Sequence, residues 1–115
     1  MTEQDKRLSD REKCYAKLVL REDCLPAYIR DVSNLGFRIE IPGDVSLEVG
    51  DRMNAKVIPV EETEGLAFGA LLEVRWIRDE APFTAVGMKL IDLDSDQARV
   101  EYNRLIEYYD MNIRD

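Results

Sequence analysis

Residues 66–90 read LAFGALLEVRWIRDEAPFTAVGMKL and contain the longest alternating pattern in the chain. Apolar and polar side chains alternate along residues 66–78, residues 79–82 (DEAP) are typical of a turn, and residues 83–90 alternate again. A period of two indicates strands with one buried face, so this stretch predicts a long antiparallel hairpin. Gly87 inside the second strand indicates a bend or a close approach of the backbone. The pattern places Leu72, Val74 and Trp76 on one face of the first strand and Glu73, Arg75 and Ile77 on the other.

The same alternation precedes this hairpin from residue 14 onward. Four further strands are expected near residues 14–21, 25–31, 37–41 and 50–57, separated by polar or glycine-containing turns. Their inward positions are Ala16, Leu18 and Leu20, then Ala27 and Ile29, then Phe37, Ile39 and Ile41, then Met53, Ala55 and Val57. The acidic segment 61–65 is expected to be a solvated hairpin loop. Six strands at this spacing predict an all-β fold, either a small antiparallel barrel or a sandwich.

The period changes after Leu93, where a C-terminal α-helix is expected over about 94–110. Asp94, with Gln97 three residues later, fits a capping box at its start. One apolar stripe is formed by Ala98, Tyr102, Leu105, Ile106 and Tyr109, and Glu101, Arg104 and Glu107 lie away from it. This helix is expected to pack on the β-sheet structure or cover one end of it, and a partner-binding helix is the alternative.

Composition excludes several classes of protein. The 115 residues fit one domain, and 16 basic against 24 acidic side chains give a net charge of −8. An acidic chain does not coat DNA or RNA through its overall field. It contains no apolar stretch of the ~20 residues that span a membrane, and its first residues contain no secretory signal. We therefore expect a soluble, cytoplasmic protein that does not insert into a membrane.

The absence of histidine argues against catalysis. Histidine is the usual general base near neutral pH and the commonest metal ligand, and this chain has none. The two cysteines, Cys14 and Cys24, cannot complete a zinc site of thiolate and imidazole ligands, and are expected to be small packing residues. We therefore expect no enzyme, no metal and no cofactor.

Two short motifs carry the functional information. Arg7 and Arg11 form an R-x-x-x-R in a polar leader, residues 1–12, that precedes the domain at 13–115. Residues 31–36 (DVSNLG) form a D-x-S-x-x-G between the second and third expected strands. The first motif is common in an arginine-rich chain, whereas the second has a chance expectation of about 0.02 in this composition. Their order and separation make the combination specific.

With these motifs, the Val74-Arg75-Trp76 strand and the Gly87 strand, the sequence resembles the PilZ domain family, bacterial receptor modules for the second messenger cyclic di-GMP. The resemblance runs from Lys6 to the final helix and implies a six-stranded antiparallel barrel with a C-terminal helix, without catalysis. It implies that Arg7 and Arg11 lie on a loop that wraps the ligand. It implies a ligand-binding set of Lys6, Arg7, Arg11, Asp31, Ser33 and Gly36.

The resemblance leaves ligand stoichiometry open at Lys6. Related proteins often carry arginine there and bind an intercalated dinucleotide dimer, and lysine keeps the charge without the planar stacking surface.

The chemistry of these residue types fits cyclic di-GMP, which has two phosphodiester anions and two guanines. Arginine can grip phosphate or guanine O6/N7 with two donors and stack on a purine. Asp31 can accept from guanine N–H groups, Ser33 can donate or accept, and Gly36 allows a positive φ or a close approach to the ligand. The alternatives are a solvated leader, an ordinary Asx turn at Asp31, and a PilZ-like adaptor that docks a protein partner without nucleotide. The cyclic di-GMP receptor, acting on a downstream protein partner, is the favoured interpretation.

Overall fold

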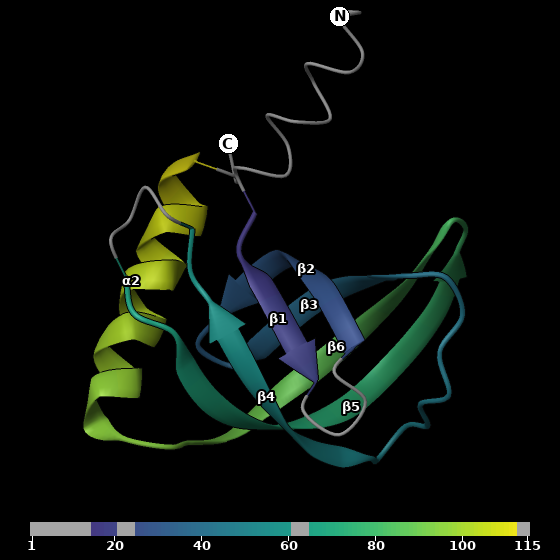
Figure 1. Cartoon of the computed structure of the whole chain (residues 1–115), viewed down its shortest axis with the longest axis horizontal. Coiled ribbons are helices and arrows are strands. Elements are labelled where there is room, and N and C mark those ends of the chain that lie inside the picture. The colour runs from purple at the N-terminus through teal and green to yellow at the C-terminus, as the bar shows by residue number, and fades with distance from the viewer. Residues whose placement is uncertain (1–14, 21–24, 61–64, 113–115) are drawn as a thin grey trace, which may run out of the picture.

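The fold is a closed six-stranded antiparallel barrel with one helix, as seen in a computed structural model that describes residues 15–20, 25–60 and 65–112 (Figure 1). The strands are β1 (Lys17–Leu20), β2 (Leu25–Ser33), β3 (Gly36–Pro42), β4 (Arg52–Ile58), β5 (Phe68–Glu80) and β6 (Phe83–Leu93), followed by helix α2 (Asp96–Asn112). Around the barrel the order is β1-β2-β3-β6-β5-β4, and each neighbouring pair is antiparallel. The expected fold class is confirmed, and the barrel replaces the sandwich alternative.

The barrel interior is filled by the inward positions that the alternation predicts. Leu18, Ile29, Ile39 and Leu72 are fully buried there, each from a different strand. Burying a side chain of this size stabilises the fold by about 1.5–3 kcal/mol relative to leaving it in water. The strands are held in register by this set, because a slip of one residue would move every apolar side chain to the solvent face.

The register shifts at three places in the barrel, and two of these shifts, β-bulges in β2 and β5, alter which face the following residues occupy. Ile29 pairs with Ile39 and Asp31 pairs with Arg38, so Arg30 is an extra residue in β2. In the same way Arg75 is an extra residue in β5, between the pairs Val74–Met88 and Trp76–Gly87. The expectation that Trp76 shares the inward face of Val74 is therefore wrong. Ile77, which the pattern placed outside, packs against the core.

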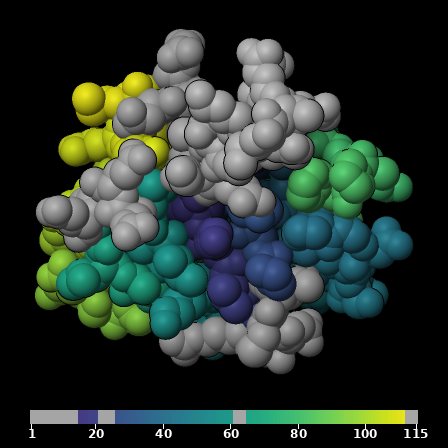
Figure 2. Space-filling view, turned by 45° about the horizontal axis from the view of Figure 1, so that its top comes forward, coloured from purple at the N-terminus to yellow at the C-terminus, as the bar shows by residue number. Residues whose placement is uncertain are grey.

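Helix α2 packs along one side of the barrel against β2, β5 and β6. In the space-filling view it lies on the opposite side of the molecule from the β5–β6 turn, with β1 and β2 between them (Figure 2). The expected stripe is buried, with Ala98, Tyr102, Leu105 and Tyr109 almost without exposed area and Ile106 half-buried. In the parts of the chain described here, no helix is long and apolar enough to cross a membrane.

Two details of the helix differ from expectation. Its N-cap is Ser95, whose Oγ accepts a hydrogen bond from the Ala98 N–H at 3.0 Å. Asp94 instead accepts from the backbone N–H of Gly69 at 3.1 Å, on β5. Glu101 does not face solvent, because the chain just before β5 covers it and the Leu66 N–H donates to its Oε2 at 2.5 Å.

Candidate ligand-binding site

The D-x-S-x-x-G motif lies on the outer face of the barrel, at the end of the β2–β3 hairpin. Its aspartate and serine belong to β2 and its glycine to β3, so the strands extend further into the motif than the pattern indicated. Pairing aligns Asp31 of β2 with Arg38 of β3, then with Gly87 of β6 and Trp76 of β5. These four residues form one row across four adjacent strands, on the face opposite the core.

The next outer row carries the rest of the motif. It runs from Ser33 through Gly36 and Lys89 to Glu73. Between the two outer rows lies a row of buried apolar residues that points into the barrel, formed by Val32, Phe37, Met88 and Val74. The outer surface is therefore polar and the layer beneath it is packed, which gives the motif a rigid base.

The two outer rows enclose a pocket of about 400 Å³. Asp31, Ser33 and Gly36 line it together with residues of β5 and β6. The structure thus brings together the three expected site residues that fall on the barrel. The other three, Lys6, Arg7 and Arg11, lie outside the described residues, as does the whole predicted leader, residues 1–12.

The turn that joins β2 to β3 is stabilised by its own polar side chains. Asp31 Oδ1 accepts from the Val32 N–H at 3.0 Å, and Ser33 Oγ accepts from the Leu35 N–H at 3.2 Å. The Leu35 carbonyl in turn accepts from the Leu90 N–H at 2.8 Å, which links the turn to β6. The Ser33 bond reaches the N–H two residues on, as serine does in turns, and both bonds hold their side chains at the rim of the pocket.

Gly36 is required by both conformation and space. Its φ is +154°, where residues with a side chain are rarely found. A Cβ at this position would overlap the Met88 carbonyl oxygen and would lie 3.0 Å from the Leu90 nitrogen. The close approach that the sequence suggested for this glycine is therefore to the neighbouring strand β6.

Trp76 forms the opposite wall of the pocket and was not expected there. The Arg75 bulge turns it outward, and its indole lies directly over Gly87, where a Cβ would overlap the ring. The Arg78 guanidinium lies 5.0 Å from the ring centroid. Gly87 in a strand was a usable signal for a close approach, and the approaching group is this indole.

Three cations surround the pocket and were also not predicted. Arg38, Arg75 and Lys89 line it from β3, β5 and β6. Arg75 Nη1 lies 3.2 Å from Glu73 Oε2, while Arg52 Nε binds the other oxygen of that carboxylate at 3.0 Å. The hydrogen bond from Arg52, aided by both positive charges, lowers the pKa of Glu73. The pocket lining therefore has more basic than acidic side chains, although Arg75 is paired with Glu73 and Arg38 Nη2 lies 3.8 Å from Glu80 Oε1.

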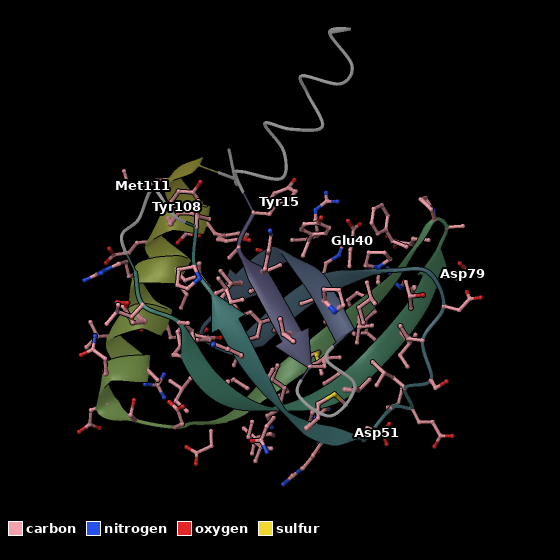
Figure 3. All side chains as sticks on the ribbon, in the orientation of Figure 1. Tyr15, Glu40, Asp51, Asp79, Tyr108 and Met111 are labelled. Carbon is pink, nitrogen blue, oxygen red and sulfur yellow. The ribbon has the colours of Figure 1, made fainter. Side chains whose placement is uncertain are left out.

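The point where the leader joins the barrel lies beside this site. The Arg30 guanidinium is 5.1 Å from the Tyr15 ring centroid and 2.7 Å from Glu40 Oε1, so it links the start of β1 to β2 and β3. Tyr15 and Glu40 lie on the same side of the barrel (Figure 3). Arg30 directly precedes Asp31, and Tyr15 follows Arg11 by four residues. Tyr15, the first described residue, therefore lies next to the residue that directly precedes the D-x-S-x-x-G motif.

Comparison with known proteins gives one match. No curated protein and no solved structure matches the chain. The family model of the PilZ domain matches residues 4–109, which covers both motifs, all six strands and most of helix α2. The chain therefore belongs to the PilZ domain family.

Proposed function

We propose that this PilZ domain is a receptor for cyclic di-GMP. PilZ domains as a family bind this second messenger, which is the general support. The observation that carries the proposal for this chain is the convergence of Asp31, Ser33 and Gly36 on one pocket. That pocket also contains three cations and an indole wall, which suit an anionic ligand with two purine rings.

The proposed roles follow from the chemistry of each group. Asp31 accepts hydrogen bonds from the N–H edge of a guanine, and Ser33 donates or accepts beside it. Gly36 keeps the turn close to β6, and its lack of a side chain allows the ligand to approach the backbone. Arg7 and Arg11, assisted by Lys6, supply bidentate contacts to phosphate or guanine from the leader. Tyr15, four residues after Arg11 in the chain, contacts Arg30, which directly precedes Asp31, and this supports a contribution of the leader to the pocket.

The proposal is a binding role and not an enzymatic one. PilZ domains are binding modules, and among the residues described here no group of acidic, cysteine or histidine side chains could hold a metal ion. A receptor for a second messenger acts by changing the activity of another molecule, so the proposal includes a downstream protein partner. The proposed location of the domain is the bacterial cytoplasm. Lys6 bears on whether one ligand or an intercalated pair is bound.

Calorimetry with cyclic di-GMP tests the proposal. Arg11→Ala should lower affinity by about ten- to a hundredfold, because a charge-assisted bidentate contact contributes about 1.5–3 kcal/mol. Its effect on unfolding should stay within about 0.5 kcal/mol, the usual range for surface substitutions. Lys56→Ala is the matched control: it removes one positive charge from the exposed face of β4, away from the pocket, and should leave affinity unchanged.

A second arm uses cyclic di-AMP. Adenine has an acceptor at N1, where guanine has an N–H group that Asp31 would bind, and it lacks the 2-amino donor, so the affinity for cyclic di-AMP should be lower by at least about tenfold. The sole tryptophan, Trp76, lies in the pocket and supplies a fluorescence signal for both titrations. Wild-type affinity in Arg11→Ala would contradict the role of the leader, and equal affinity for both dinucleotides would contradict the role of Asp31.

A further inference from the structure

Helix α2 reaches the D-x-S-x-x-G turn through one side chain, Tyr102. This residue is fully buried, and its ring makes edge contacts with Phe37 at 5.4 Å and Phe68 at 6.3 Å between centroids. Its hydroxyl donates a hydrogen bond to the Ser33 carbonyl and lies 3.5 Å from the Gly36 carbonyl. The phenol therefore contacts the backbone on both sides of the turn, from inside the barrel.

The two carbonyls belong to Ser33 and Gly36, two residues of the motif that line the pocket. Ser33 and Gly36 are paired across the hairpin, and only Asn34 and Leu35 separate them in the chain. A movement of either carbonyl rotates the adjacent peptide planes, and this moves Ser33 Oγ relative to the pocket. The rings of Phe37 and Phe68 restrict the phenol to one position, so the hydroxyl is a fixed reference point for the turn.

We propose that Tyr102 is a positioning residue of the ligand site: its hydroxyl holds the backbone of the D-x-S-x-x-G turn in the conformation that presents Ser33 and Asp31 to the nucleotide. This inference rests on the proposed function. Tyr102 is not among the residues that line the pocket, so its effect on binding passes through the turn.

The same helix provides a matched control in Tyr109. This tyrosine is also fully buried, seven residues further along the apolar stripe, and its hydroxyl donates to the Ile29 carbonyl. It also accepts from the Ala16 N–H at 3.0 Å. Tyr102→Phe and Tyr109→Phe thus each remove one buried hydroxyl from one helix face, but only the first removes a contact with the turn.

Calorimetry with cyclic di-GMP separates positioning from general stability. Tyr102→Phe should lower the melting temperature by about 3–8 °C, the loss of about one hydrogen bond in a domain of this size. Tyr109→Phe should lower it by at least as much, because the Tyr109 hydroxyl makes two hydrogen bonds. Tyr102→Phe should weaken binding by about tenfold, and Tyr109→Phe by less than about twofold. In a Ser33→Ala background the effect of Tyr102→Phe should fall below about threefold, because the group that it positions is gone.

Backbone amide NMR of the ligand-free protein supplies the readout that does not depend on binding. Tyr102→Phe should shift the amide resonances of Asn34, Leu35 and Gly36, and Tyr109→Phe should leave them in place. If wild-type protein fails to bind cyclic di-GMP, the proposed function is wrong, and the amide shifts still decide whether Tyr102 positions the turn. Equal loss of affinity in both tyrosine variants, or unmoved turn resonances in Tyr102→Phe, would overturn the inference.

Discussion

Replacing Gly36 by alanine is the sharpest test of how the binding turn is built. The glycine has a φ of +154°, and an added Cβ would overlap the Met88 carbonyl oxygen of β6. Gly43 provides a matched control, because its φ of +83° is equally unusual for a side chain but a Cβ there would meet nothing within 4 Å. The pair therefore separates backbone strain from steric overlap.

The expected magnitudes follow from these two terms. A residue with a side chain held in a sparsely populated backbone region costs about 1–3 kcal/mol, and this applies to both variants. Gly36→Ala carries a further cost of about 1–3 kcal/mol, since the overlapped atom belongs to the backbone of β6 and cannot change rotamer to escape. The overlap also disturbs the bond from the Leu90 N–H to the Leu35 carbonyl. Gly36→Ala should therefore be about 1–3 kcal/mol less stable than Gly43→Ala.

Urea unfolding of the two variants measures the difference, and titration with cyclic di-GMP measures its effect on the pocket. We expect Gly36→Ala to lose both stability and affinity, and Gly43→Ala to lose some stability and keep wild-type affinity. Equal stability of the two variants would refute the argument that β6 excludes a side chain at position 36. Wild-type affinity in Gly36→Ala would show that the turn can move away from β6 without altering the site.

Two further predictions concern the helix tyrosines and the indole wall. Burial raises the pKa of Tyr102 to about 12 and that of Tyr109 still further. Below pH ~10 both tyrosines are therefore protonated in the folded and in the unfolded chain. Above this pH the unfolded chain loses these protons first, so the free energy of unfolding should fall as the pH rises from ~10 to ~12. Urea unfolding at several alkaline pH values should show a smaller decline in the doubly substituted Tyr102→Phe, Tyr109→Phe protein, and an identical decline would contradict this assignment. Gly87→Ala should displace the indole of Trp76, because the added Cβ would occupy the position of the ring. The variant should therefore show red-shifted tryptophan emission and weaker binding of cyclic di-GMP. Unchanged emission would show that the indole does not rest on Gly87.

The elements that sequence predicted well are those governed by simple periodicity. A strand buries alternate side chains, so Ala16, Leu18 and Leu20 could be assigned to the core before the structure was known. The helix stripe followed from its own period in the same way. Prediction failed where a contact distant in sequence decides the outcome. Asp94 was expected to cap the helix, but its carboxylate accepts a hydrogen bond from the Gly69 N–H of β5, and Ser95 is the N-cap instead.

Prediction of the site followed the same division. The D-x-S-x-x-G motif identified Asp31, Ser33 and Gly36, since it is contiguous in sequence and its turn is local. The residues of the opposite wall come from β5 and β6, and their side of the sheet depends on a bulge that has no local sequence signal. The leader residues remain predictions from the motif, because they lie outside the described part of the chain.

The two bulges explain how a barrel with a strictly packed interior presents a polar site. Ile29 and Val74 point into the core, and in a regular strand Asp31 and Trp76, each two residues later, would do the same. The extra residue between each pair reverses the alternation, so both side chains lie on the outer face. Without the bulge in β2 a carboxylate would enter an apolar core, where an unpaired charge is strongly destabilising.

β2 and β5, the strands that carry these two bulges, lie on either side of the central pair β3–β6, and this determines the form of the pocket. The two residues that the bulges turn outward, Asp31 and Trp76, belong to the same row of paired residues. Arg38 and Gly87 form the middle of this row, so the carboxylate and the indole lie at its opposite ends. Gly87 has no side chain and so leaves space for the indole above it, while Arg38 contributes a positive charge between the two ends of the row. One extra residue in each of two strands therefore converts a closed barrel wall into a basic, aromatic-lined surface suited to a purine dinucleotide.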